Sequence, residues 1–312
     1  MAKTIDIQVP DLTGRRAVVT GASDGIGLQI AARLARAGAE LLMPVRNTVK
    51  GQAAAERIRA QAPNAQLEVH ELDLASLASV ASFAHGLLTD GRPVGILINN
   101  AGVMTPPTRQ LSVDGFELQF ATNHLGHVAL TAHLLPLLQA GRAHVTTQVS
   151  VAADQGSVNW NDVSWASGYD PMKAYSSSKI ALGLFAIELD RRSADEGWGI
   201  RSNLSHPGVT PTNLLAAQPQ LGRPQDTTAV RFIRALSRRG ILFGTPESAA
   251  LTAVYAATSP DAAGGRLYGP SGFQHLRGVP AEQRLYSRLE NAADARRIWD
   301  LSERLVGVDL VA

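Results

Sequence analysis

Cysteine is absent from this chain of 312 residues. Its absence excludes disulfide bonds, thiolate metal sites and a cysteine nucleophile, and it suits the reducing cytoplasm. Long hydrophobic runs are also missing, since none reaches the roughly 18 apolar residues that a membrane-spanning helix needs. The segment Met1–Asp11 carries charge early and lacks the apolar stretch of a signal peptide. We therefore expect a cytoplasmic protein without a transmembrane segment.

An excess of charge of one sign is lacking as well. The sequence holds 29 Lys and Arg against 27 Asp and Glu, for a formal net charge of +2, and no basic stripe stands out. A nucleic-acid partner is therefore not expected. Hydrophobic residues make up 45% and charged residues 18%, a composition that is typical of a compact folded protein and argues against disorder.

Short apolar runs alternate with longer helical patterns from Gly14 onward. Such alternation predicts a parallel sheet covered by helices on both faces. We predict an α/β fold: a single Rossmann-type, doubly wound parallel sheet of about seven strands, flanked by helices and followed by a C-terminal helical extension. The predicted strands are Ala17–Thr20, Glu40–Val45, Gln66–Leu72, Ile96–Asn99, His144–Val149, Ile200–Ser205 and Arg266–Tyr268.

The whole chain, residues 1–312, is predicted to be one domain. Two stretches interrupt the alternation, Val151–Asp170 and about 213–244. The second follows the sixth predicted strand, at the sheet edge where open α/β sheets bind ligands, and we expect it to be a substrate lid. The C-terminal extension covers about 271–312, with a helical segment around Ala281–Val306.

A glycine-rich turn, TGASDGIG, joins the first predicted strand to the first helix. Gly21 permits a tight turn, Gly25 allows a pyrophosphate close to the backbone, and Gly27 allows the helix to pack on the strand. The free N–H groups and the dipole at the helix N-terminus favour an anion there. The spacing differs from the usual G-x-G-x-x-G fingerprint, so the turn alone is weak evidence, which its place between strand and helix strengthens.

Further motifs follow in a characteristic order. They are NNAG at Asn99–Gly102, then Asn123, Ser150, Tyr175-Ser-Ser-Ser-Lys179 and His206-Pro207-Gly208. Together with the glycine turn, this series resembles the short-chain dehydrogenase/reductase family over roughly Gly14 to Pro270. The contexts ATNHLGH and HPG are most similar to its retinol-dehydrogenase-like and protochlorophyllide-reductase-like branch.

The resemblance implies a nicotinamide cofactor. NAD-preferring relatives carry an acidic residue near the end of the second strand, whereas this chain has Val45, Arg46 and Asn47 there. A guanidinium pairs with a 2′-phosphate, so we expect NADP(H) rather than NAD(H), unless Arg46 is an ordinary surface residue. The cofactor-binding residues expected are Gly21, Ser23, Asp24, Gly25, Ile26, Gly27, Arg46, Asn47, Asp73, Leu74, Asn100, Ala101, Gly102, Tyr175, Lys179, Pro207, Gly208, Val209, Thr210 and Thr212.

The expected catalytic residues are Asn123, Ser150, Tyr175 and Lys179. Tyr175 and Lys179 are four residues apart, so a helix places both on one face. A nearby ammonium is expected to lower the tyrosine pKa and to make Tyr175 the general acid or base. The resemblance implies that Lys179 also binds the nicotinamide ribose, that Ser150 binds the substrate oxygen, and that Asn123 holds a helix distortion and a water that relays protons to Lys179.

A second Y-x-x-x-K match, Tyr169 to Lys173, competes with this assignment. Asp170 and Pro171 are typical of a helix N-cap and a first helical residue. Tyr169 then precedes the helix and cannot share a face with Lys173. Tyr175 is therefore preferred as the catalytic tyrosine, and Tyr169 is expected to line the substrate entrance.

The substrate is expected to be a hydrophobic small-molecule carbonyl or alcohol, because the predicted lid is apolar at both ends. Its arginines (Arg223, Arg231, Arg234, Arg238 and Arg239) suit either an acidic substrate group or a solvated face.

No metal is expected, since His124, His127 and His133 lack carboxylate or thiolate partners. Family members often pair through the helices that carry Asn123 and Tyr175, so a homo-oligomer is possible. The alternatives are an NADP-binding sensor or scaffold without catalysis, and an enzyme that reduces an enone C=C bond.

Overall fold

The computed structural model describes residues 6–208, 210, 221–222, 244–272 and 275–310. Its strands form one eight-stranded sheet in the order β3-β2-β1-β4-β5-β6-β7-β8. Each neighbouring pair is parallel except β7 and β8. The order reverses between β1 and β4, as in a doubly wound Rossmann sheet. The predicted α/β fold is therefore confirmed.

The strands agree closely with the predicted ranges. Their bounds are Arg16–Val19 (β1), Glu40–Val45 (β2), Leu67–Glu71 (β3), Ile96–Asn99 (β4), His144–Gln148 (β5), Arg201–Ser205 (β6), Leu267–Pro270 (β7) and Pro280–Gln283 (β8). Successive side chains of a strand point to opposite faces of the sheet. Val18 and Leu42 accordingly join the apolar cluster on one face, while Val19 and Leu41 join the cluster on the other.

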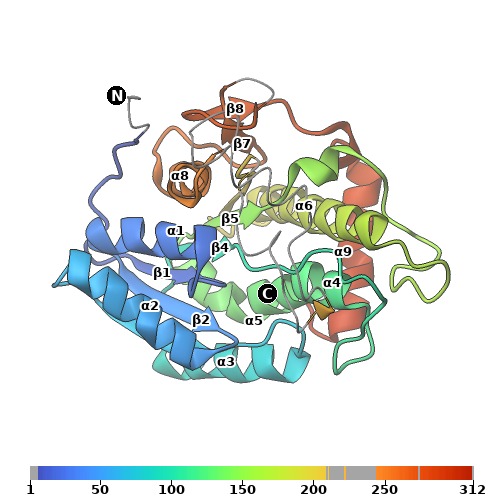
Figure 1. Cartoon of the computed structure of the whole chain (residues 1–312), viewed down its shortest axis with the longest axis horizontal. Coiled ribbons are helices and arrows are strands. Elements are labelled where there is room, and N and C mark those ends of the chain that lie inside the picture. Colours follow the sequence, from blue (N-terminus) through green and yellow to red (C-terminus); the bar gives the residue numbers. More distant parts are fainter. Residues whose placement is uncertain (1–5, 209, 211–220, 223–243, 273–274, 311–312) are drawn as a thin grey trace.

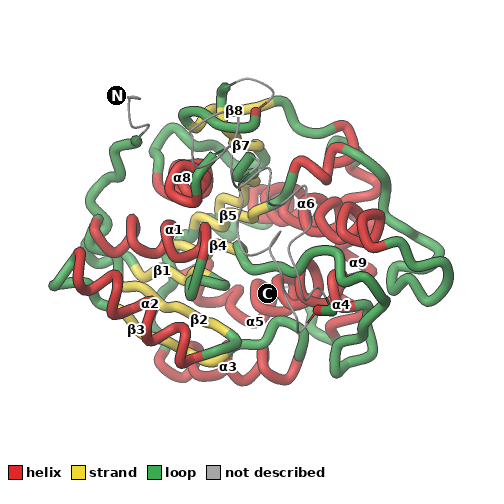
Figure 2. The backbone as a smooth tube through the Cα atoms, in the orientation of Figure 1, coloured by secondary structure: helices red, strands yellow, loops and turns green. Residues whose placement is uncertain are grey.

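Helices cover both faces of this sheet (Figures 1 and 2). The clusters place α1, α2 and α8 on one face, and α3, α5, α6 and α9 on the other. The helix bounds are Gly25–Arg36 (α1), Thr48–Gln61 (α2), Leu77–Asp90 (α3), Leu118–Phe120 (α4), Gly126–Ala140 (α5), Pro171–Asp195 (α6), Pro246–Thr258 (α8) and Ala292–Val306 (α9). Among the described helices, none combines the length and apolar character required to cross a membrane.

The C-terminal extension differs from the prediction at its start. The helical segment expected from Ala281 begins only at Ala292; before it come β8 and a short 3-10 turn, η5 (Ser287–Leu289). Strand β8 pairs antiparallel with β7, from Leu267 opposite Gln283 to Pro270 opposite Pro280. The helical reading was wrong there because the edge of β7 offers unpaired backbone groups, which the segment after Val279 satisfies as a strand.

Helix α9 packs on both α6 and α5. Trp299 of α9 is fully buried and stacks on Phe185 of α6, with the ring centroids 5.2 Å apart. The extension thus covers part of the two helices through which family members often pair. A homo-oligomer stays a prediction, and a pair formed through these helices has to accommodate α9.

Candidate active site

A cavity of about 1060 Å³ opens beyond the carboxyl ends of the parallel strands, where doubly wound sheets bind ligands. Most of the predicted site residues line it: Gly21, Ser23, Asp24, Gly25, Ile26, Gly27, Arg46, Asn47, Asp73, Leu74, Asn100, Ala101, Gly102, Ser150, Tyr175, Lys179, Pro207, Gly208 and Thr210. Asn123 does not line the cavity, and Val209 and Thr212 lie outside the described residues. Positions far apart in the chain are thereby brought to one place.

The glycine turn after β1 has no room for a side chain at Gly27. A Cβ at Gly27 would lie 2.4 Å from the Gly21 carbonyl oxygen and 2.5 Å from Asn100 Nδ2. Gly21 itself has φ 69°, in the left-handed region. Asp24 caps helix α1, and its carboxylate accepts the N–H of Gly25 at 2.7 Å. The turn therefore presents glycine backbone and a helix N-terminus to the cavity, which is the arrangement that a pyrophosphate requires.

The end of β2 presents cations to the same cavity. Arg46 directly follows Val45, is exposed, and lines the cavity together with Lys50. Asn47 caps α2, because its Oδ1 accepts the backbone N–H of Lys50 at 2.9 Å. No carboxylate stands at the position where NAD-binding relatives carry one. The local charge therefore suits a phosphate on the ribose.

Thr20, at the end of β1, joins the glycine turn to the NNAG loop after β4. Its Oγ1 accepts the backbone N–H groups of Asn100 at 2.9 Å and Ala101 at 3.0 Å. The Asn100 side chain returns a hydrogen bond from Nδ2 to the Thr20 carbonyl at 2.8 Å. Two cavity walls are thus held in register by a residue that the sequence analysis did not single out.

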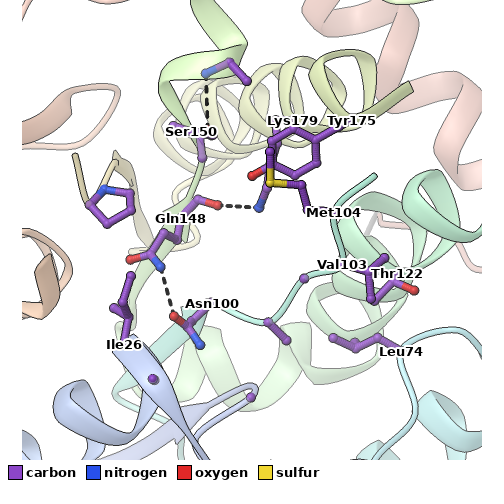
Figure 3. A pocket seen from close by; sticks show the side chains of 18 of the residues that line it. Ile26, Leu74, Asn100, Val103, Met104, Thr122, Gln148, Ser150, Tyr175 and Lys179 are labelled. Atoms are coloured by element: carbon purple, nitrogen blue, oxygen red, sulfur yellow. Dashed lines mark hydrogen bonds between the residues drawn. The ribbon is translucent and has the colours of Figure 1, made fainter. Parts of the chain in front are cut away.

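Tyr175 and Lys179 lie on one face of α6, which begins at Pro171 with Asp170 as its N-cap, as predicted. Both are buried, with 3% and 4% exposure. Lys179 Nζ donates a hydrogen bond to the backbone carbonyl of Gln148 at 2.9 Å, and Gln148 Nε2 donates to Asn100 Oδ1 at 2.9 Å (Figure 3). The last residue of β5 therefore orients the lysine and ties it to the NNAG loop.

Burial determines the protonation behaviour of this pair. Desolvation lowers the pKa of Lys179 to about 8. It raises the pKa of Tyr175, and a hydrogen bond with the Ser150 side chain opposes that rise. The tyrosine pKa is therefore raised overall and not lowered as expected, because burial penalises the phenolate and the ammonium donates its hydrogen bond to Gln148. Tyr175 is therefore a neutral phenol, able to donate a proton, at neutral pH.

Ser150 lies two residues after the end of β5 and is the N-cap of a 3-10 turn, η2 (Val151–Asp154). Its Oγ accepts the N–H of Ala152 at 3.2 Å, which holds the hydroxyl at the cavity wall. A serine here stands within reach of the Tyr175 phenol. The two hydroxyls can therefore meet at one substrate oxygen.

Asn123 lies in a π-helical turn, Ala121–Leu125, so the helix is distorted at this residue. Its Oδ1 accepts the N–H of Val103 at 2.8 Å, and its Nδ2 donates to the Val103 carbonyl at 3.0 Å and to Ser178 Oγ at 2.9 Å. Next to Val103, a Cβ at Gly102 would lie 3.7 Å from Lys179 Nζ. The Asn123 side chain thus holds the NNAG loop against α6, which is a positioning contact behind the cavity wall.

His127, one turn after Asn123, is a further residue of the site, which the sequence analysis considered only as a metal ligand. Its Nδ1 lies 3.0 Å from the Asn123 carbonyl oxygen, and its Nε2 lies 3.0 Å from Thr20 Oγ1. Because a carbonyl only accepts, Nδ1 carries the proton and Nε2 accepts the Thr20 hydroxyl. Burial lowers the pKa of His127 to about 4, so the ring is neutral at pH 7. His127 therefore connects the π-helical turn to both cofactor-side loops.

Replacing His127 by leucine leaves the Thr20 hydroxyl and the Asn123 carbonyl without this partner. We expect a loss of about 2 kcal/mol in the free energy of unfolding. We also expect a rise of about tenfold in KM for the cofactor, because the turn and the loop lose their common anchor. Thermal melts and initial rates measure both. His133→Leu on the same helix is the matched control, and an unchanged KM alongside lost stability would mean that His127 is only structural.

Tyr169 does not line the cavity. Its hydroxyl donates to the Pro106 carbonyl at 3.0 Å and accepts from Gln119 Nε2 at 3.2 Å. The prediction that Tyr169 lines the substrate entrance is therefore wrong. Its hydroxyl instead holds the loop that follows NNAG through these two hydrogen bonds. Its position before α6 agrees with the choice of Tyr175.

Comparisons with known proteins show which family the chain is similar to. The family model described as short chain dehydrogenase matches residues 15–220. Retinol dehydrogenase 14 of Mus musculus is 36% identical over 310 residues, which cover 95% of this chain and 86% of that protein. Polyprenol dehydrogenase of Mus musculus is 37% identical over 306 residues, covering 96% and 86%. The RhlG/NADP active-site complex of Pseudomonas aeruginosa matches with a TM-score of 0.61 and 27% identity, over 82% of this chain and 94% of that one.

Proposed function

The chain belongs to the short-chain dehydrogenase/reductase family of oxidoreductases, and we propose that it transfers a hydride between NADP(H) and a carbonyl or alcohol group of a hydrophobic small molecule. The observation that carries this proposal is the convergence of Ser150, Tyr175 and Lys179 on the cavity that the glycine turn also lines. The proposal treats residues 1–312 as one domain, and the cytoplasmic location stays a prediction.

The residues at the cavity wall fit the dinucleotide. The glycine turn at Gly21–Gly27 suits the pyrophosphate, Asp73 and Leu74 suit the adenine, and the loop at Pro207 and Gly208 suits the carboxamide. When bound, the nicotinamide supplies or accepts the hydride with its electron pair. The side chain of Lys179, which lines the cavity and donates to the Gln148 carbonyl, suits a ribose hydroxyl.

In the direction of reduction, the protein's task is to place one proton on the substrate oxygen. Ser150 donates a hydrogen bond to that oxygen and orients it. As the carbonyl carbon receives the hydride, Tyr175 transfers its phenolic proton to the oxygen, and the product is an alcohol. Lys179 stabilises the phenolate that remains, until a proton from solvent restores the phenol. Oxidation of an alcohol runs through the same steps in reverse.

The preference for NADP(H) is supported by Arg46 and Lys50 beyond β2. We expect Arg46→Glu to lower kcat/KM for NADPH by about 10²-fold, because the carboxylate repels the 2′-phosphate that the guanidinium attracts. The value for NADH should change by less than about threefold. Initial rates with both cofactors measure this, and Arg304→Ala on the exposed face of α9 is the control. Equal losses with NADPH and NADH would contradict the assignment.

The class of substrate is supported by the apolar part of the cavity wall, where Met104, Val151 and Met172 lie, and by the names of the relatives, which act on retinol and polyprenol. We therefore propose an isoprenoid-like alcohol or aldehyde. The test is NADPH oxidation with all-trans-retinal and farnesal, followed by product analysis. Alcohol products support the proposal. A saturated C=C bond would identify an enone reductase instead, and NADPH binding without oxidation would identify a sensor or scaffold.

A further inference from the structure

The C-terminal extension contributes a residue to the cavity wall. Tyr286 lies between β8 and η5 and lines the cavity, as does Asp154 at the end of η2. The two short turns η2 and η5 pack against each other. Because η2 begins directly after Ser150, Tyr286 and Asp154 lie on the substrate side of the cavity and away from the glycine turn.

A glycine on α6 fixes the position of this segment. Leu289 of η5 is 1% exposed and packs on Gly183, where a Cβ would lie 2.8 Å and 3.0 Å from the two methyl carbons of Leu289. Gly183 is four residues after Lys179 and therefore on the same helical face. The lack of a side chain at position 183 lets Leu289 reach the helix backbone. Because Tyr286 is only three residues before Leu289, this contact also fixes the position of Tyr286.

The phenol of Tyr286 is uncharged. Burial, and then the carboxylate of Asp154, raises its pKa above the usual range. Its ring centroid lies 6.0 Å from that of His206, which itself is neutral because burial lowers its pKa to about 4. Within the described residues, the hydroxyl of Tyr286 has no hydrogen-bond partner. The side chain therefore offers the cavity a fixed aromatic surface with one neutral hydroxyl.

Charge is distributed unevenly among the described residues that line the cavity. On the cofactor side, the cations Arg46 and Lys50 stand with the carboxylates of Asp24 and Asp73. On the substrate side, the carboxylate of Asp154 at the end of η2 has no cation of this kind beside it among the described lining residues. Lys179 is engaged with Gln148. A substrate carboxylate near the reacting carbon would therefore face Asp154 and an apolar wall, and neither compensates its charge.

We propose that Tyr286 and Asp154 form a selectivity subsite: the Tyr286 ring binds the apolar body of a neutral carbonyl compound, and the Asp154 carboxylate disfavours anionic substrates. This inference rests on the proposed function and adds the charge of the substrate to it. The inference argues against the alternative in which the arginines between residues 223 and 239 bind an acidic group of the substrate. Those arginines lie outside the described residues.

The test compares two aldehydes of similar size, 4-isopropylbenzaldehyde and 4-carboxybenzaldehyde, at pH 7 and low ionic strength. Asp154→Asn should raise kcat/KM for the carboxylate by about three- to tenfold, because the removed charge is exposed and partly screened. The value for the neutral aldehyde should stay within about twofold. Tyr286→Ala should lower kcat/KM for the neutral aldehyde by about tenfold, whereas Tyr286→Phe keeps the ring and most of the rate.

Two controls separate this subsite from general damage. Asp261→Asn removes an exposed carboxylate that does not line the cavity, and it should leave both aldehydes unchanged. KM for NADPH should stay constant in the Tyr286 and Asp154 variants. The inference is overturned if wild-type protein prefers the carboxylate, or if both variants leave the ratio of the two kcat/KM values unchanged.

A binding measurement keeps failure of the inference distinct from failure of the proposed function. If the protein oxidises no NADPH with these two aldehydes or with all-trans-retinal and farnesal, the proposed function fails. Calorimetric titration of the NADP-saturated protein with 4-isopropylbenzyl alcohol and 4-carboxybenzyl alcohol still tests the subsite. Tighter binding of the neutral alcohol, lost in Tyr286→Ala, supports the inference, and equal or reversed affinities overturn it.

Discussion

Tyr175→Phe should lower kcat by about 10³-fold while the Kd for NADPH changes by less than about twofold. The substitution removes only the hydroxyl, and the ring of this α6 residue keeps its buried position. Since burial raises the pKa of Tyr175, the wild-type phenol is protonated at neutral pH and is the proton source for the substrate oxygen. Stopped-flow single-turnover rates measure the chemical step, and NADPH fluorescence measures binding.

Tyr169→Phe is the matched control, because Tyr169 belongs to the competing Y-x-x-x-K match and lies outside the cavity wall. We expect its kcat to stay within about threefold of wild type. If Tyr175→Phe lost NADPH affinity and turnover in parallel, or if the two variants behaved alike, Tyr175 would not be the proton donor.

Lys179→Met should have opposite effects on activity and stability. Turnover should fall by about 10²-fold or more, because the phenolate of Tyr175 loses its nearby cation. The free energy of unfolding should rise, because burial lowers the pKa of Lys179 from 10.5 to about 8 and the buried charge costs on the order of 3 kcal/mol at pH 7. Loss of the hydrogen bond to Gln148 offsets part of that gain.

The difference in the free energy of unfolding between Lys179→Met and wild type depends on pH, and the pKa shift of Lys179 determines its sign. Between about pH 8 and 10.5, unfolded wild-type chains hold a proton that the folded protein has released, so wild-type stability rises with pH in this window. The advantage of Lys179→Met is therefore largest below pH 8 and vanishes near pH 10.5. Thermal melts across this range measure it. Lys173→Met, at an exposed position on the same helix, should show neither effect, and a similar stabilisation there would refute the burial argument.

Several features of the site could be predicted from residues close together in the chain. The glycine spacing in TGASDGIG, the Asp170-Pro171 start of α6 and the four-residue interval from Tyr175 to Lys179 act through local backbone geometry. For this reason the sequence alone determined the strand–helix order, the turn that suits a pyrophosphate, and which tyrosine faces the cavity with a lysine. These properties require only helix and strand periodicity and the conformational freedom of glycine.

Tertiary structure decided which partner each of these groups meets. The Lys179 ammonium binds a backbone carbonyl 31 residues away, and Thr20 meets His127 across 107 residues. A backbone carbonyl carries no residue-specific signal, and the depth of burial that raises the tyrosine pKa follows from the packing of several elements together. Strand β8 and the approach of Tyr286 likewise depend on the free edge of β7 and the bare face at Gly183. Such contacts form only after distant elements have packed, so no local pattern could have revealed them.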